Sequence, residues 1–240
     1  MAIRTDDTGF GGLLLLQDTE SFCYGVDAVL LADAADAAPN DRVLDLGSGN
    51  GAVALIVTGK FSPAYVLGIE LQEAMHRLAC ETAKLNHLEE KLQFQHGDVT
   101  DIRNLVPAAS FDVVTCNPPY TEAGRGPESR KDAAYLARHE TTAALEDFVR
   151  AGAFALKPGG RFVLVHRPSR LADIFQAFRS NGLEPKRMRL AAPRPGAAPN
   201  IVLVTATKGG GKELLVEPTL YIRNEDGTYS GELQKIYGRI

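Results

Sequence analysis

The side chains best suited to chemistry follow a short apolar run near residue 45 of this 240-residue chain. Asp45 lies near the end of that run, and glycines then alternate with polar residues over Gly47–Gly51. Glycine permits positive φ and lets the backbone approach a ligand that a side chain would push away. The segment therefore predicts a ligand-binding loop, with contacts from Asp45, Gly47, Ser48, Gly49, Asn50 and Gly51.

Two more carboxylates follow the next two β-rich runs. Glu70 comes 19 residues after Gly51, and a carboxylate in this place can accept hydrogen bonds from two ribose hydroxyls. Asp98 can accept a hydrogen bond from the exocyclic amine of an adenine ring. Together with their neighbours Leu71 and Val99, these residues predict contacts with an adenine nucleoside.

The spacing also separates one nucleoside cofactor from another. Dinucleotide sites prefer G-x-G-x-x-G, whereas here the glycines alternate and Asp45 precedes the first by two residues, where it can organise a cationic amino group. This pattern favours S-adenosylmethionine (SAM) over NAD, without a metal. A phosphate-binding Walker loop is excluded, because Gly59-Lys60 is followed by Phe61 and the segment 208–212 lacks the Ser or Thr that holds magnesium.

A second chemical motif is Asn117-Pro118-Pro119-Tyr120, directly after an apolar run. Proline fixes φ and has no N–H, so the carbonyls here can point outward. The carboxamide oxygen of Asn117 and one such carbonyl form two acceptors for a planar amine, whose lone pair is then presented to a methyl donor. Tyr120 can stack on the base that carries the amine, which contributes about 1–3 kcal/mol. We expect these four residues to be catalytic, and a nucleic-acid substrate to present a flipped base.

These motifs need a scaffold, and β-rich runs alternating with helical segments predict a mostly parallel sheet with helices on both faces. The predicted strands are Arg42–Leu46, Tyr65–Leu71, Leu92–His96, Phe111–Cys116 and Arg161–His166, and the predicted helices are Asp27–Ala32, Ala52–Lys60, Gln72–His87, Thr142–Leu156 and Ser169–Ser180. Thr142 is expected to cap its helix, and Lys157–Gly160 to form the turn after it. Pro185–Ala191 and Asn200–Thr207 predict a C-terminal antiparallel hairpin, and Glu213–Arg223 an edge strand.

Charge is divided unevenly along the chain, although the net charge is only −4. Residues 1–120 hold 7 basic and 17 acidic side chains, whereas residues 121–240 hold 19 and 13. Phosphate binding needs local Lys and Arg rather than a basic whole protein, so the second half can face a nucleic acid. The basic residues that could hold phosphates are Arg125, Arg130, Lys131, Arg138, Arg167, Arg170, Lys186, Arg187 and Arg189.

Cysteine usage and hydropathy point to a cytoplasmic protein without a membrane partner. Cys23, Cys80 and Cys116 are odd in number and widely spaced, so no disulfide framework is predicted. The early apolar run Leu13–Leu16 is too short for a signal peptide or a membrane span and is expected in the core. The sequence does not predict an oligomeric state.

The chain shows a resemblance to a known group of enzymes. Asp45-x-Gly-x-Gly-x-Gly51, Glu70 and Asn117–Tyr120 together resemble the class I SAM-dependent methyltransferases that modify planar amines, which have a Rossmann-like sheet. The stretches 25–32, 137–140, 165–168 and 224–227 add a more particular similarity to the bacterial tRNA1(Val) adenine-N6 methyltransferase family. The resemblance runs from about Gln17 to Gly238.

This resemblance implies a SAM-dependent transfer of a methyl group to the N6 amine of an adenine in RNA, with tRNA as the best substrate. It implies cofactor contacts from the residues named above and substrate contacts from Arg138, His139 and Arg167. Residues 1–40 are expected to form a segment that covers the cofactor, 41–208 the methyltransferase domain, and 209–240 an appendage packed on it.

Three other functions remain open from the sequence. Protein glutamine methyltransferases share the Asn-Pro-Pro-Tyr motif, but they carry a helical recognition domain before the SAM fold, and only about 40 residues precede the first predicted strand. DNA adenine methylation normally needs a separate target-recognition domain, for which no segment is long enough. A SAM-binding module without catalysis is disfavoured by the intact Asn117–Tyr120 motif.

Overall fold

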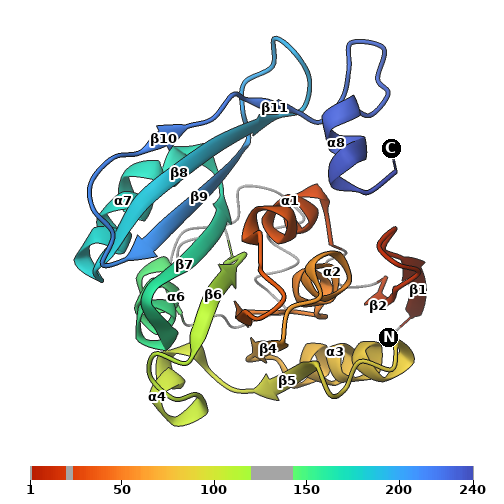
Figure 1. The fold of residues 1–240 in the computed structure, drawn as a ribbon. Helices are drawn as coiled ribbons and strands as arrows, with labels where there is room; N and C mark the ends of the chain where they lie inside the picture. Colours follow the sequence, from red (N-terminus) through yellow and green to blue (C-terminus); the bar gives the residue numbers. More distant parts are fainter. Residues whose placement is uncertain (1, 20–23, 120–142, 240) are drawn as a thin grey trace.

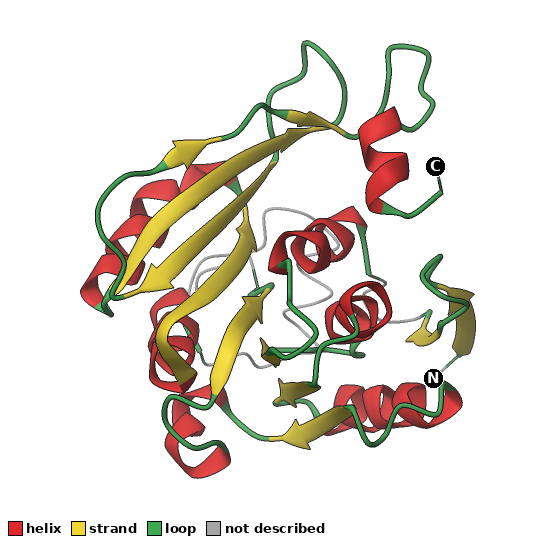
Figure 2. Cartoon of the chain, in the orientation of Figure 1, coloured by secondary structure: helices red, strands yellow, loops and turns green. Residues whose placement is uncertain are grey.

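The computed structural model describes residues 2–19, 24–119 and 143–239. Within these ranges a nine-stranded mixed sheet runs through the molecule, with helices against both of its faces (Figures 1 and 2). The strand order is β10-β8-β9-β7-β6-β3-β4-β5, and β11 also pairs with β8. This arrangement confirms the predicted α/β sheet, mostly parallel with a C-terminal antiparallel hairpin.

The parallel part of the sheet carries the motifs found in the sequence. Its strands are β3 (Arg42–Leu46), β4 (Tyr65–Glu70), β5 (Leu92–His96), β6 (Phe111–Cys116) and β7 (Leu156–His166). The elements between them are α2 (Ala52–Phe61), α3 (Glu73–Leu85), the 3-10 turn η1 (Val99–Asp101), α4 (Ile102–Leu105) and α6 (Leu145–Ala155). All five strands run in one direction, so their carboxyl ends meet at one edge.

The last third of the chain adds an antiparallel edge. After the 3-10 turn η2 (Pro168–Arg170) and α7 (Leu171–Ser180), β8 (Leu183–Ala192) and β9 (Ile201–Lys208) form the predicted hairpin. Two short strands, β10 (Leu215–Val216) and β11 (Leu220–Tyr221), then pair in parallel with β8, where one edge strand was expected. Helix α8 (Gly231–Ile236) follows, and Ser230 caps it by accepting a hydrogen bond from Leu233 N–H.

The N-terminal region forms a separate hairpin that the sequence pattern did not reveal. Strands β1 (Ile3–Asp7) and β2 (Leu14–Asp18) pair antiparallel, and α1 (Val26–Ala35) follows. β2 is tied to α3 by side chains: Asn86 accepts from Leu14 N–H at 2.8 Å and donates to its carbonyl at 2.7 Å. Leu15 is fully buried, which confirms that the leucine run contributes to the core.

Two cores lie on opposite faces of the sheet. One joins α1, α2, α8 and the N-terminal hairpin, and the other joins α4, α6 and α7 (Figure 1). The alternation along each strand decides the face, since Val43 and Val113 enter the first core while Leu44 and Val114 enter the second. In the described part of the chain, no helix combines the length and the apolar character needed to cross a bilayer.

Two local expectations were wrong. Helix α6 begins at Leu145 with Ala144 as its N-cap, whereas the expected cap, Thr142, lies outside the described residues. Asp147 accepts the N–H of Ala144 at 2.8 Å. The segment Lys157–Gly160 is not a connecting turn, because β7 starts at Leu156. A shift in the β6–β7 register absorbs the extra residues as a bulge, so a Pro-Gly-Gly segment is accommodated inside a strand.

Candidate functional site

The predicted glycine loop lies at the carboxyl edge of β3 and is held by backbone bonds to β4. Gly47, Gly49 and Gly51 all have positive φ, which explains why glycine occupies these three alternate positions. The N–H groups of Gly47 and Ser48 both donate to the carbonyl of Ile69, at 2.9 and 3.0 Å. The loop is therefore shaped before any ligand contacts it.

Glu70 completes that shape with its side chain. One carboxylate oxygen accepts from Gly49 N–H at 2.7 Å, and the other accepts from Gln72 N–H at 2.8 Å. Burial raises the pKa of Glu70. The two backbone hydrogen bonds, a third one from the backbone of Leu71 and the charge of His96 lower it. Each oxygen keeps acceptor capacity for a ribose hydroxyl, because a carboxylate oxygen can accept more than one bond.

Asp45 is a buried carboxylate at this edge. Its side chain is buried, and one oxygen, Oδ1, accepts from the hydroxyl of Thr115 at 2.7 Å. The other oxygen, Oδ2, has no hydrogen-bond partner among the described residues. Burial raises the pKa of Asp45 to about 7; the Thr115 hydroxyl and the Ala54 N–H oppose that rise, and the Glu70 charge adds to it.

A second unpartnered atom lies in the glycine loop that follows Asp45. Ser48 Oγ is buried without a hydrogen-bond partner in the described part of the chain. It occupies space left by Gly68, where a Cβ would come within 2.7 Å of it and within 2.4 Å of the Phe94 ring. By contrast, a Cβ on Gly49 would meet nothing within 4 Å, so space remains beside the loop.

These features fit SAM chemically. Native proteins rarely leave buried polar atoms unpaired, and such atoms in a loop with open space beside it indicate a missing partner. A carboxylate oxygen without a partner suits an ammonium group, and a buried hydroxyl suits a carboxylate or a second polar group. SAM carries both an ammonium and a carboxylate on its methionine end.

The remaining predicted cofactor residues follow β4 and β5. Asp98 accepts from Thr100 N–H at 2.8 Å and thereby caps η1, while Val99 is buried. The carbonyl of Leu71 bonds His96 Nε2 at 2.7 Å, which ties the end of β4 to the end of β5. Asn50 donates to the carbonyl of Leu16 at 3.1 Å and so links the loop to the N-terminal hairpin, a contact that the sequence did not predict.

The predicted amine-binding motif begins immediately after β6, next to the glycine loop. Leu46 and Cys116 are register partners in β3 and β6, so Gly47 and Asn117 follow at the same level of the sheet edge. Asn117 is half-buried and Pro118 is buried. The structure thus brings together the two motifs that lie about 70 residues apart in the sequence. Tyr120, Arg138 and His139 lie outside the described residues.

The end of β7 adds His166, the last residue of its predicted strand. It is buried, and burial together with Arg170 and Arg167 lowers its pKa to about 4. Its Nδ1 accepts from Arg167 N–H at 2.8 Å, so the neutral ring carries its proton on Nε2. Arg167, a predicted substrate contact, follows at the N-cap of η2.

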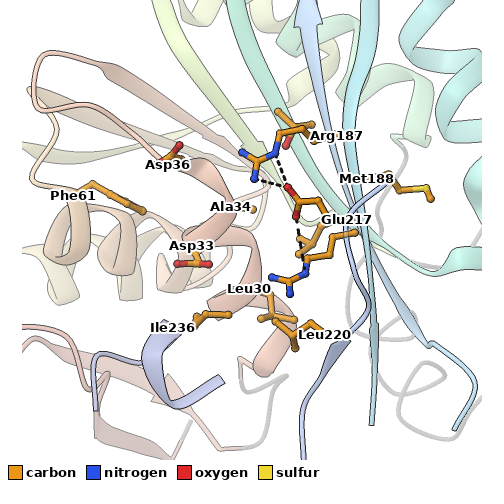
Figure 3. A pocket seen from close by; sticks show the side chains of 13 residues that line it. Leu30, Asp33, Ala34, Asp36, Phe61, Arg187, Met188, Glu217, Leu220 and Ile236 are labelled. Atoms are coloured by element: carbon orange, nitrogen blue, oxygen red, sulfur yellow. Dashed lines mark hydrogen bonds and ion pairs between the residues drawn. The ribbon is translucent and has the colours of Figure 1, made fainter. Parts of the chain in front are cut away.

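A cavity of about 280 Å³ lies elsewhere, between α1, β8 and the C-terminal segment (Figure 3). Arg187 binds Glu217 through two nitrogens, at 2.7 and 2.5 Å. Arg189 pairs with Glu232 at 2.5 Å. These two arginines, which were candidates for holding phosphates, anchor the C-terminal segment to β8. The described residues include no group of three or more His, Cys, Asp or Glu side chains that could hold a metal ion.

Fold and site together define a class I methyltransferase. The family described as "Methyltransferase domain" matches residues 37–191, and the chain belongs to it. Among solved structures, the fold is similar to that of a protein described as a predicted O-methyltransferase from Agrobacterium tumefaciens, with a TM-score of 0.73 and 25% identity over 89% of this chain and 96% of that one. TrmN from Thermus thermophilus is also similar, with a TM-score of 0.55 and 25% identity over 75% of this chain and 48% of that one.

Curated relatives narrow the class. The tRNA1(Val) (adenine(37)-N6)-methyltransferase of Shewanella halifaxensis is 30% identical over 85% of this chain and 86% of its own length. The Dickeya chrysanthemi enzyme of the same name is 25% identical over 98% and 94%. The match to the Porphyromonas gingivalis relative, at 31% identity, spans 60% of that protein. The chain therefore belongs to the tRNA1(Val) (adenine(37)-N6)-methyltransferase family, as the sequence motifs indicated.

Proposed function

We propose that this protein transfers the methyl group of SAM to the N6 amine of an adenine in tRNA, and that the adenine is the one named in its relatives, position 37 of a valine tRNA. The observation that carries the proposal is the position of Asn117-Pro118-Pro119 at one sheet edge, beside the glycine loop that follows Asp45 and contains Ser48. An amine-binding motif and a site for a cationic donor lie side by side there.

In this proposal the chain holds SAM at its methionine end and at its adenosine. Asp45 Oδ2 accepts from the ammonium group of SAM, and Glu70 accepts from the ribose hydroxyls. Asp98, Leu71 and Val99 surround the adenine ring. SAM supplies the electrophilic methyl group, and the chain supplies position and charge.

The acceptor side is held by the Asn-Pro-Pro motif. Asn117 Oδ1 and a proline carbonyl accept the two N–H groups of the adenine amine, which directs the nitrogen lone pair away from the ring. The N–C bond forms as the S–C bond breaks, and one amine proton then leaves to solvent. Tyr120 stacks on the base, while Arg138, His139 and Arg167 contact the RNA around it.

The test is incubation with radiolabelled SAM and, in parallel, total tRNA, total rRNA or a protein extract, followed by nucleoside and amino-acid analysis. We expect label in N6-methyladenosine from tRNA only. A valine tRNA transcript should be labelled, and the same transcript with guanine at position 37 should not. Label in protein glutamine, or none in any RNA, would overturn the proposal.

A further inference from the structure

One buried hydroxyl connects the cofactor edge with the strand that carries the amine-binding motif. Thr115 on β6 and Asp45 on β3 are register partners, and both side chains are buried. Their neighbours on the same face, Val113 and Val163, belong to the apolar core of that face. A hydroxyl in such a row needs a partner, and Thr115 has one in Asp45 Oδ1, at 2.7 Å.

The other groups that face Asp45 do not fix it in the same way. Glu70, from β4, repels its charge. The Ala54 N–H, in the first turn of α2, favours the charge, although Oδ2 itself has no hydrogen-bond partner in the described part of the chain. Cys116, next to Thr115, has its thiol pKa raised by burial and by the Asp45 charge, so it stays neutral. Thr115 is therefore the one described side chain that hydrogen-bonds this carboxylate.

We propose that Thr115 is a positioning residue for SAM, because its hydroxyl holds one Asp45 oxygen and leaves the other to pair with the cofactor's ammonium group. The inference rests on SAM being the cofactor. Thr115 also lies two residues before Asn117, which directly follows the end of the same strand. The end of β6 and the residue after it therefore orient the carboxylate for the donor and present the amide for the acceptor.

The substitution Thr115→Val tests this inference, because valine keeps the shape and removes the hydroxyl. Thr115→Ser restores the hydroxyl and removes only a methyl group. Thr58→Val is the matched control, since Thr58 is also buried but bonds a carbonyl of its own helix, Ala54 O, at 2.8 Å. SAM affinity is measured by calorimetry on the full chain, without RNA, from about pH 6 to pH 8, with thermal unfolding as a check on folding.

We expect Thr115→Val to weaken SAM binding about tenfold near pH 7, comparable to the loss of one hydrogen bond to a charged group. The rise of SAM affinity with pH should shift to higher pH, because the Asp45 carboxylate has lost the donor that favours its charged form. Thr115→Ser should restore both the affinity and the pH profile, and Thr58→Val should change neither.

Two results would overturn the inference. Thr115→Val could bind SAM with the affinity and pH profile of the wild type, or Thr115→Ser could lose as much affinity as Thr115→Val, which would assign the effect to packing. A wild-type protein that binds no SAM would instead overturn the cofactor assignment in the proposed function, and this inference with it.

Discussion

Two regions of this protein combine charge with open space, and they differ in how far their polar groups are satisfied. At the carboxyl edge of β3, β4 and β6, Asp45 Oδ2 and Ser48 Oγ are buried without partners among the described residues. In the cavity beside β8, Arg187 pairs with Glu217 (Figure 3), and the neighbouring Arg189 pairs with Glu232. The first region lacks partners that a ligand can supply, and the second is a completed contact between two parts of the chain.

The difference shows that an open volume is a weaker sign of function than an unsatisfied buried atom. Unpaired buried polar groups are rare in folded proteins, because each lowers the stability by roughly 1–3 kcal/mol. Where they persist, a ligand can supply the missing partner. The cavity beside β8 costs nothing of this kind, because its charges neutralise one another. Substitutions in the first region should therefore change SAM binding, whereas substitutions in the second should change only the stability of the fold.

The largest effect should come from the acceptor half of the first region. Asn117→Ala removes one of two proposed acceptors for the amine, so we expect kcat to fall by about 10²–10³-fold, as for the loss of a key polar group in other active sites. SAM affinity should stay within about twofold, measured by calorimetry. Asn181→Ala, which removes an amide at the end of α7, serves as the control. Near-normal turnover of Asn117→Ala would contradict the mechanism.

The next effect concerns the space beside the glycine loop. Gly49→Ala adds a methyl group where the protein has nothing within 4 Å, at φ +57°. Gly196→Ala is a close match, with φ +77° and the same free space in the turn between β8 and β9. Both should lose about 1 kcal/mol of unfolding free energy through backbone strain. Only Gly49→Ala should weaken SAM binding, by about 100-fold, and equal affinities for the two variants would show that the loop does not contact the cofactor.

Asp45 should show a conflict between stability and binding. Asp45→Asn removes a buried charge, so we expect the ligand-free protein to gain roughly 1–3 kcal/mol of unfolding free energy at pH 8. The same change removes the partner of the ammonium group, and SAM affinity should fall at least tenfold. Chemical denaturation and calorimetry measure the two effects, and a less stable variant would contradict the account.

The sign of the pH dependence follows from the raised pKa of Asp45, about 7 in the folded protein against about 3.9 in an unfolded chain. Between these values the folded state retains a proton that the unfolded state has released, so stability falls as pH rises through this window. Asp45→Asn should therefore stabilise the protein above pH 7 and have little effect near pH 4. In the wild type, SAM binding should tighten from pH 6 to about pH 7.5, as Asp45 becomes charged.

The smallest effect should come from the second region. Glu217→Gln weakens the pair with Arg187, whose side chain is 54% exposed, so we expect a loss of less than about 1 kcal/mol of unfolding free energy. SAM affinity and turnover should not change. A loss of SAM affinity greater than threefold would show that the two regions are coupled and would end the distinction drawn between them.

Much of the fold was predictable because the residue types at the strand ends are characteristic. Short apolar runs followed by glycines or carboxylates located the parallel strands along the chain, and the Asn-Pro-Pro motif marked the end of β6. The N-terminal hairpin was missed because β1, with the sequence Ile-Arg-Thr-Asp-Asp, has no buried face of its own. The bulge in β7 was missed because Pro158 and Gly159 read locally as a turn, and only pairing with β6 and β9 shows a strand.

The residues of the site were predictable from the sequence, but the contacts between them were not. The motif identified Asp45, yet its partner Thr115 lies 70 residues away and becomes visible only through the register of β3 and β6. Asn50 was expected to contact the cofactor, and its bond to Leu16 depends on a hairpin that the sequence did not reveal. Such contacts between distant segments carry no local signal.

The bond between Glu70 and Gly49 has a thermodynamic consequence. Fixing one residue costs about 1–2 kcal/mol in backbone entropy, and the loop from Gly47 to Gly51 has five residues. Because Glu70 and the carbonyl of Ile69 hold the loop in the ligand-free fold, most of that entropy is lost when the chain folds. Little ordering is then left for the moment of binding, so cofactor uptake and product release can proceed without refolding of the loop.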